Sequence, residues 1–243
     1  MVPEASQGNI MNVLLLGNSD GIGLRLTSDL LSKGYQVVGI SKSAPQVDFA
    51  EYQNLTQHLM DVRSPDFKET FANVVCTIGH LDLCVYCIGI GEELDFSRLQ
   101  SETTVFEVNL MSAVVVTEVV LQKMLKDKSG HFIGLSSIAD AFPAAAAPSY
   151  HASKAGISYY WEGLGLALLA QKSKVKVSNI RFGFVDTKMA KSPSKPFMIS
   201  PEAASNYVLE IVDKPKLRAS KPLIMACAAK MVRLLVNMKI LLS

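Results

Sequence analysis

The sequence has few of the residues that build metal and disulfide sites. Its four histidines are scattered, and no two have the spacing of a metal-binding pair. Its one C-x-x-C pair, Cys84 and Cys87, lies in an apolar stretch without a second such pair. The pattern therefore indicates buried thiols that pack as small hydrophobic groups, not a zinc or redox site. Free thiols are typical of a reducing compartment, so we expect a cytoplasmic protein.

An excess of charge of one sign is also missing. Basic residues exceed acidic ones by only two, and no basic block stands out, which argues against a nucleic-acid surface. Residues 1–8 lack the apolar core of a signal peptide, and the first apolar run, 13–16, is too short to cross a bilayer. Because 49% of the 243 residues are apolar, we expect one globular domain spanning 1–243.

Apolar stretches alternate with helical patterns along most of the chain. Strands that are apolar throughout are typical of parallel sheets covered on both faces. The alternation predicts the α/β class, a doubly wound parallel β-sheet flanked by helices. We expect strands at residues 11–17, 35–41, 58–61, 81–88, 131–136 and 175–181, and helices at 21–33, 64–77, 103–127, 150–171, 202–212 and 228–242. Residues 222–226 fit an edge strand or an extended lead-in.

A glycine-rich turn joins the first strand to the first helix. It places Gly17, Gly21 and Gly23 in the spacing G-x3-G-x-G, with Ser19, Asp20 and Ile22 between them. Glycine lets the backbone approach a pyrophosphate closely, and the following helix points free N–H groups and its positive dipole end at the phosphates. At this junction the turn predicts a dinucleotide site, although a glycine turn without a ligand stays an alternative.

The second predicted strand ends without an acidic residue. An acid there would bind the adenosine ribose and repel a 2′-phosphate. The chain instead has Ser41 and Lys42, a hydroxyl and a positive charge, which favours NADP (NADPH) over NAD. Asp20 in the glycine turn argues against a phosphate nearby. The alternative is that Lys42 is an ordinary surface lysine without a role in cofactor binding.

Tyr150 and Lys154 begin the long helix predicted at 150–171. They are four residues apart and share one helix face. An ammonium group favours the phenolate and makes a tyrosine a usable acid or base for an alcohol–ketone pair. Ser137 ends the fifth strand, where doubly wound sheets bind ligands, and Asn109 is an unusual residue for the middle of a helix.

The glycine turn, Asn109, Ser137 and the Tyr150–Lys154 pair occur in this order, and together they resemble the short-chain dehydrogenase/reductase family. The resemblance covers about residues 13–189. It implies a Rossmann fold and an oxidoreductase that transfers hydride between a nicotinamide dinucleotide and a carbonyl or alcohol.

The resemblance also implies roles for individual residues. Tyr150 is expected to be the acid in reduction and the base in oxidation, and Lys154 to bind the nicotinamide ribose and lower the pKa of Tyr150. Ser137 is expected to orient the carbonyl, and Asn109 to hold a water of the proton relay. Further positions that match cofactor contacts are Asp61, Val62, Cys87, Gly89, Gly183, Val185 and Thr187.

Three departures from the family pattern concern the cofactor site. The usual Asn-Asn-Ala-Gly after the fourth strand is replaced by residues 86–89, Tyr-Cys-Ile-Gly, so this turn must be stabilised differently. The usual Thr before the first glycine is Leu16, and the usual Pro-Gly after the sixth strand is Phe182-Gly183. These changes bear on cofactor affinity more than on the chemistry.

Residues 188–243 are expected to form the substrate loop and a C-terminal helical region. The loop 188–199 does not identify a substrate. The apolar helix at 228–242 carries Lys230 and Arg233 near one face, and we expect it to pack against the protein or a partner, with membrane-surface contact as an alternative. In the family the helix that begins at Tyr150 commonly forms a dimer interface, so a homodimer or homotetramer is expected.

Two other functions stay open. One is a catalytically silent dinucleotide sensor or scaffold of the same fold, and the other is a peripheral membrane reductase of lipid-like substrates. The presence of Asn109, Ser137, Tyr150 and Lys154 together favours an enzyme.

Overall fold

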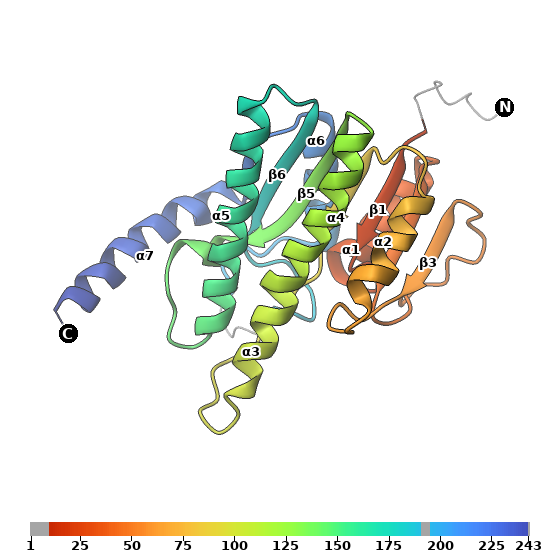
Figure 1. Cartoon of the computed structure of the whole chain (residues 1–243). Helices are drawn as coiled ribbons and strands as arrows, with labels where there is room; N and C mark the ends of the chain where they lie inside the picture. Colours follow the sequence, from red (N-terminus) through yellow and green to blue (C-terminus); the bar gives the residue numbers. More distant parts are fainter. Residues whose placement is uncertain (1–9, 191–194, 243) are drawn as a thin grey trace.

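A seven-stranded parallel sheet forms the centre of the computed structural model, which describes residues 10–190 and 195–242 (Figure 1). The strand order is β3-β2-β1-β4-β5-β6-β7. Because the order reverses between β1 and β4, a ligand crevice is expected at the carboxyl ends of these two strands. The strands are β1 (Asn12–Leu16), β2 (Gln36–Ser41), β3 (Leu55–Leu59), β4 (Leu83–Tyr86), β5 (Gly130–Ser137), β6 (Val175–Phe182) and β7 (Arg218–Lys221).

Helices cover both faces of the sheet, which confirms the predicted doubly wound α/β class. One face carries α1 and α6, and the other carries α2, α4 and α5 (Figure 1). The α-helices are α1 (Gly21–Ser32), α2 (Phe67–Thr77), α3 (Gln100–Phe106), α4 (Ser112–Lys126), α5 (Pro148–Ala170), α6 (Pro201–Asp213) and α7 (Leu223–Leu241).

The central strand β1 shows why its sequence is apolar throughout. Successive side chains of a strand point to opposite faces. Leu14 and Leu16 join the cluster under α2, α4 and α5, whereas Val13 and Leu15 join the cluster under α1 and α6. All four are buried, so neither face of β1 meets water.

Several predicted elements differ in their bounds, and two of these differences concern predicted site residues. The third strand is β3, which ends two residues before Asp61 rather than at it. The helix predicted at 103–127 is interrupted by a π-helical turn, η1 (Glu107–Met111), between α3 and α4. By length and composition the whole stretch Gln100–Lys126 could cross a membrane, but half of its most apolar window is buried, as in the core helix of a folded domain.

The C-terminal region departs furthest from expectation. The edge strand is β7, so the strand suggested at 222–226 is wrong, and α7 begins at Leu223. The helix predicted at 202–212 is α6. Residues 191–194 of the predicted substrate loop, and residues 1–8 of the N-terminal segment, lie outside the described residues.

Candidate functional site

Tyr150 and Lys154 lie in the first turns of α5, beside the carboxyl end of β5. The helix begins at Pro148, which suits a first helical position because it needs no N–H partner. Lys154 Nζ lies over the Tyr150 ring, 5.9 Å from its centroid, and donates a hydrogen bond to Leu135 O at 3.4 Å. Lys154 is buried, and burial lowers its pKa from 10.5 to about 8.

Ser137 connects the end of β5 to this pair. Its hydroxyl is hydrogen-bonded to Tyr150, accepts from Ala139 N at 3.1 Å and lies 3.3 Å from the acceptor Phe182 O. Burial raises the pKa of Tyr150, the Ser137 hydrogen bond partly opposes this rise, and the Asp140 carboxylate adds to it. The net shift is thus opposite to the one expected from Lys154, because desolvation is the largest effect on the phenol. A lowering of this pKa by Lys154 stays a prediction.

Asn109 lies in η1 and ties two parts of the site together. Its amide donates to Ile90 O at 2.8 Å and to Ser153 Oγ at 3.2 Å, while its side-chain oxygen accepts from Ile90 N at 2.8 Å. Ser153 in turn donates to Tyr150 O at 2.8 Å. The π-helical turn thus explains an asparagine within a helical stretch, and such turns are frequent at functional sites. A role for Asn109 in holding a water stays a prediction.

Tyr86 replaces an asparagine that the family usually has after β4. Its hydroxyl is 2.7 Å from Ser112 Oγ and 3.2 Å from Val108 O, so it anchors the strand end to η1 and α4. Cys87 follows, and burial raises the pKa of its thiol to about 12, which keeps it neutral. Cys84 is fully buried and packs in the core, so both thiols of the C-x-x-C pair behave as apolar groups.

Two glycines after β4 keep the space beside Lys154 and Tyr150 open. A Cβ on Gly89 would lie 3.2 Å from Lys154 Nζ and 3.7 Å from Met189 Cε. A Cβ on Gly91 would lie 3.8 Å from the Tyr150 ring. Sequence analysis missed Gly91 and Met189, although the alternation in Gly89-Ile90-Gly91 was a signal for the first. We call Asn109, Ser137, Tyr150, Lys154 and Gly89 the α5 end of the site.

The glycine turn between β1 and α1 needs its three glycines. Gly17 and Gly21 have φ angles of 83° and 53°, where a side chain is strained. A Cβ on Gly23 would lie 2.0 Å from Gly17 O, which is an overlap. Of the residues between, Ile22 packs against the core and Ser19 O accepts from the backbone of Gln46.

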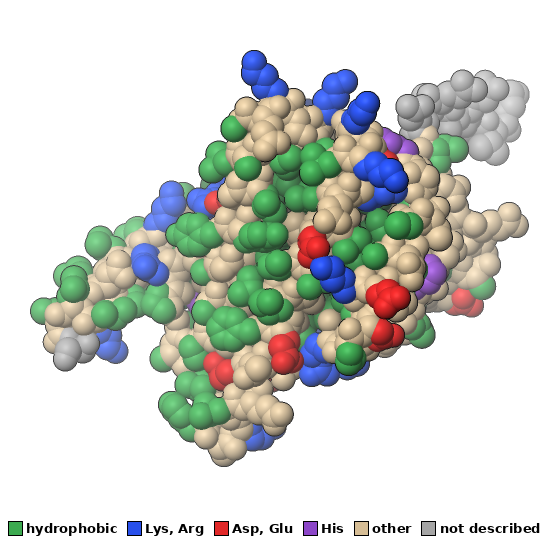
Figure 2. All heavy atoms as spheres, viewed as in Figure 1, with side chains coloured by type: hydrophobic (Ala, Val, Ile, Leu, Met, Phe, Trp, Pro, Cys, Tyr) green, Lys and Arg blue, Asp and Glu red, His purple; other side chains and the backbone are tan. Residues whose placement is uncertain are grey.

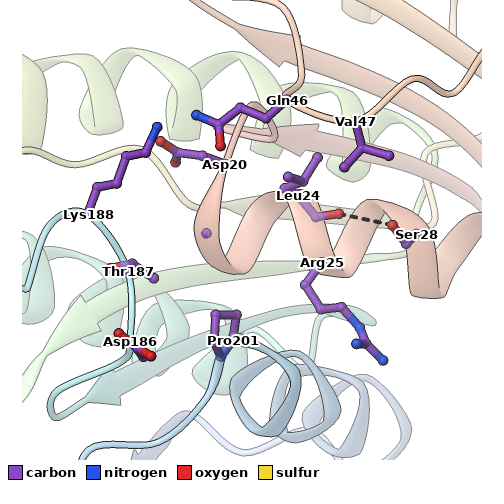
Figure 3. Close-up of a pocket in the computed structure, with 11 residues that line it drawn as sticks. Asp20, Leu24, Arg25, Ser28, Gln46, Val47, Asp186, Thr187, Lys188 and Pro201 are labelled. Carbon is purple, nitrogen blue, oxygen red and sulfur yellow. Dashed lines mark hydrogen bonds between the residues drawn. The ribbon is translucent and has the colours of Figure 1, made fainter.

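A cavity of about 500 Å³ lies beside this turn, between α1 and the segment after β6 (Figure 3). Its lining includes Asp20, Gly21, Thr187 and Lys188. A Cβ on Gly21 would lie 3.0 Å from Thr187 Cγ2, so the predicted contact residue Thr187 does reach the glycine turn. Figure 3 shows Lys188 and Gln46 pointing toward Asp20, which places a positive charge near the carboxylate that had counted against a phosphate.

The Ser41 hydroxyl is engaged by neighbouring groups of the protein. It is buried, and its hydroxyl donates to Ser43 O at 2.7 Å and accepts from Gln57 Nε2 at 3.1 Å. Gln57 Oε1 also accepts from Asn18 Nδ2 of the glycine turn at 2.7 Å. The Ser41 hydroxyl therefore stabilises the join between β2, β3 and the turn, and a contact of Ser41 with the cofactor stays a prediction.

Lys42 and Asp61, both predicted cofactor contacts, form an ion pair at 2.9 Å. The backbone N–H of Arg63 and the Lys42 ammonium lower the pKa of Asp61, and Arg63 Nε lies 3.7 Å from the same carboxylate. Sequence analysis missed Arg63. Val62 packs against the core. We call Ser41, Lys42, Asp61 and Arg63 the β2 end of the site.

Gly183 and Val185, after β6, make packing and backbone contacts in the structure. Gly183 N donates to Lys221 O at 2.9 Å, and a Cβ on Gly183 would lie 2.8 Å from Met225 Sδ of α7. Val185 is buried and forms a bridge with Ile199. Both follow the carboxyl end of β6, next to Ser137 on the neighbouring strand.

The residues present fit a bound dinucleotide. Gly21 of the glycine turn lines the cavity, so the turn can cradle a phosphate there, and it leads into the N-terminus of α1. The buried Lys154 ammonium has three donors and, among the described residues, one long hydrogen bond, so it retains donors for a ligand hydroxyl. No cluster of three potential metal ligands occurs in the described ranges.

Comparison with known proteins matches this arrangement to a family. The family model described as short chain dehydrogenase matches residues 11–196, more than half of the chain. This chain belongs to the short-chain dehydrogenase family. It is thus an oxidoreductase of a family that uses NAD or NADP.

Relatives of this short-chain dehydrogenase differ in cofactor. It is 28% identical to an uncharacterized oxidoreductase of Myxococcus xanthus, over 92% of both chains. It is 29% identical to 15-hydroxyprostaglandin dehydrogenase [NAD(+)] of Bos taurus, over 75% of this chain and 71% of that one. A short chain dehydrogenase from Burkholderia cenocepacia, solved in complex with NADP, shares the fold with a TM-score of 0.78 and 19% identity, over 91% of both chains.

Proposed function

We propose that this oxidoreductase transfers hydride between NADPH and a carbonyl or alcohol substrate. The observation that carries the proposal is the hydrogen bond between Ser137 and Tyr150, with the Lys154 ammonium over the same ring. A hydroxyl that orients an oxygen, a phenol that exchanges a proton and a nearby cation are what a carbonyl–alcohol reaction needs.

The side chains of the α5 end divide the work. A bound nicotinamide supplies or accepts the hydride. Ser137 holds the substrate oxygen beside the Tyr150 hydroxyl, and Tyr150 donates a proton to it in reduction or removes one in oxidation. Burial raises the pKa of Tyr150 and so favours the protonated phenol, the form that acts as the acid in reduction.

The preference for NADPH is supported by the β2 end. Lys42 is 68% exposed and follows β2 directly, where a 2′-phosphate is expected. Arg63 adds a second positive charge next to Asp61. Two cations around one carboxylate leave a net positive charge at this point, which favours a phosphorylated ribose.

For the localisation and the oligomeric state of the protein, we keep the predictions made from the sequence. We propose a cytoplasmic protein, because its four cysteines are free. We also propose a homodimer or homotetramer through α5, because Tyr159, Leu166 and Leu169 are exposed on that helix.

Cofactor titration followed by turnover tests the function. We expect intrinsic fluorescence to show tighter binding of NADPH than of NADH, and a panel of aldehydes and ketones to include at least one that oxidises NADPH. Replacing Tyr150 with Phe removes the proton donor, so we expect kcat to fall by about 10²–10⁴-fold while the NADPH affinity stays within about twofold.

The same experiment separates the alternatives. If the unmodified protein and Tyr150→Phe bind NADPH equally and neither turns over any carbonyl, the catalytically silent sensor or scaffold is the better reading. If NADH binds as tightly as NADPH, the cofactor preference is wrong while the reaction stands.

A further inference from the structure

Helix α7 presents a long apolar surface to solvent. Met231, Leu234, Leu235 and Met238 are between 52 and 72% exposed. Figure 1 shows α7 extending away from the sheet, and Figure 2 shows hydrophobic side chains along this extension. Isolated exposed apolar residues are ordinary, but a continuous row of them marks an interaction surface.

Only the first turns of α7 pack on the body of the protein. Ala226 and Ala229 are buried there, and Met225 lies against Gly183. The same turns contact β7 and the short helix η2 (Ile138–Ala141), which directly follows Ser137. The expectation that the helix packs against its own chain therefore holds for its first turns but not for the exposed part that follows them.

The apolar surface is accompanied by positive charge only. Residues 214–243 contain seven Lys or Arg and no Asp or Glu, although the whole chain has a net charge of only +2. On the helix, Lys230 and Arg233 are exposed and three residues apart, so they share one side. Met231, Leu235 and Met238 follow the spacing of another side.

We propose that α7 docks on a lipid bilayer whose surface carries anionic headgroups. A helix with a wide apolar face and lysine or arginine on its polar side lies in the plane of such an interface, with the cations at the headgroups. Three basic residues within the helix, Lys230, Arg233 and Lys239, disfavour a span.

A second copy of the chain fits the α7 surface less well. Symmetric pairing of α7 with itself would bring the same cations together, because the helix has no carboxylate to offset them. A bilayer with anionic lipid complements both the charge and the apolar face.

Docking would set the orientation of the site. Because the first turns of α7 contact η2 and Gly183, beside Ser137, a docked helix would attach the α5 end of the site to the bilayer through these turns. Membrane binding itself does not depend on the proposed reaction, so either can fail while the other stands.

Sedimentation with vesicles tests the docking of the full chain. We expect binding to phosphatidylcholine vesicles containing 30% phosphatidylglycerol, weaker by about tenfold or more without the anionic lipid or in high salt. The variant Leu234→Glu/Leu235→Glu should weaken binding by about tenfold or more, because two apolar side chains become charged. The variant Lys230→Gln/Arg233→Gln/Lys239→Gln should remove the preference for the anionic vesicles.

A matched control changes two exposed leucines elsewhere. Leu59→Glu/Leu99→Glu should leave vesicle binding within about twofold, because these side chains are exposed outside α7. Equal binding to neutral and anionic vesicles would overturn the charge part of the proposal. Absence of vesicle binding would overturn it entirely, and a dimer that becomes monomeric in Leu234→Glu/Leu235→Glu would show that α7 covers a second copy.

Discussion

The two ends of the site are built in different ways. At the α5 end, all four predicted catalytic residues lie on or beside one helix and strand, and hydrogen bonds join Asn109, Ser153, Tyr150 and Ser137. At the β2 end, of the two residues singled out for cofactor preference, Ser41 is buried and its hydroxyl is hydrogen-bonded to Ser43 and Gln57, and Lys42 forms an ion pair with Asp61. The spacing of two residues along a helix thus determines that their side chains lie close together. The sequence at the end of a strand does not determine where the side chains point.

The glycine turn lies between the two ends, and changing it should have the largest effect. Gly23→Ala would place a Cβ 2.0 Å from Gly17 O and distort the cradle, so we expect NADPH to bind about a hundredfold more weakly. Gly163→Ala is the control, since a Cβ there meets nothing within 4 Å. Fluorescence titration measures both, with circular dichroism to check folding, and unchanged affinity in a folded Gly23→Ala would show that the turn does not carry the cofactor.

The α5 end should respond to pH through Lys154. Burial lowers its pKa to about 8, so the free protein loses the ammonium as pH rises through 8. Since an anionic dinucleotide favours the protonated form, its Kd should increase by about tenfold between pH 7 and pH 9. A flat profile of Kd over this range would contradict a direct contact between Lys154 and the cofactor.

A substitution at the β2 end should change the preference between NADPH and NADH by a smaller factor. Lys42→Glu reverses an exposed charge, so we expect the ratio of NADH to NADPH affinity to rise about fivefold. Lys33→Glu, exposed at the end of α1, is the matched control and should leave the ratio unchanged. Ser41→Ala should leave it within about twofold, because that hydroxyl faces Ser43 and Gln57. An unaltered ratio in Lys42→Glu would remove the basis for the NADPH preference.

The smallest effect concerns Tyr86, which anchors the α5 end in place of the usual asparagine. Tyr86→Phe removes hydrogen bonds to Ser112 and Val108, and we expect a loss of about 1 kcal/mol in the free energy of unfolding in urea. Tyr35→Phe is the control and should cost almost nothing, because the Tyr35 hydroxyl makes no hydrogen bond within the described residues and lies outside α5. Equal stability of both variants would mean that the buried hydroxyl is not a net support of this turn.

Sequence was sufficient for the six strands β1 to β6 and for most of the α5 end, but not for β7. Strands such as β1 are apolar on both faces, and four residues of helical spacing bring Tyr150 and Lys154 together, so local patterns decide both features. Sequence was not sufficient for the interrupted helix around Asn109, since a π-helical turn depends on contacts with Ile90, far along the chain. The sequence also could not predict that the outer part of α7 is exposed. An apolar helix has the same sequence pattern whether or not another element covers it.

The amide of Asn109 has a consequence for the shape of the crevice. Its two groups meet the N–H and C=O of Ile90 in the manner of one residue of a neighbouring strand. One side chain thus imitates a strand beyond the end of β4 and fixes the backbone there. Because a side chain supplies both hydrogen bonds, no further strand has to pass Ile90, and the backbone at Gly89 stays close to the Lys154 ammonium.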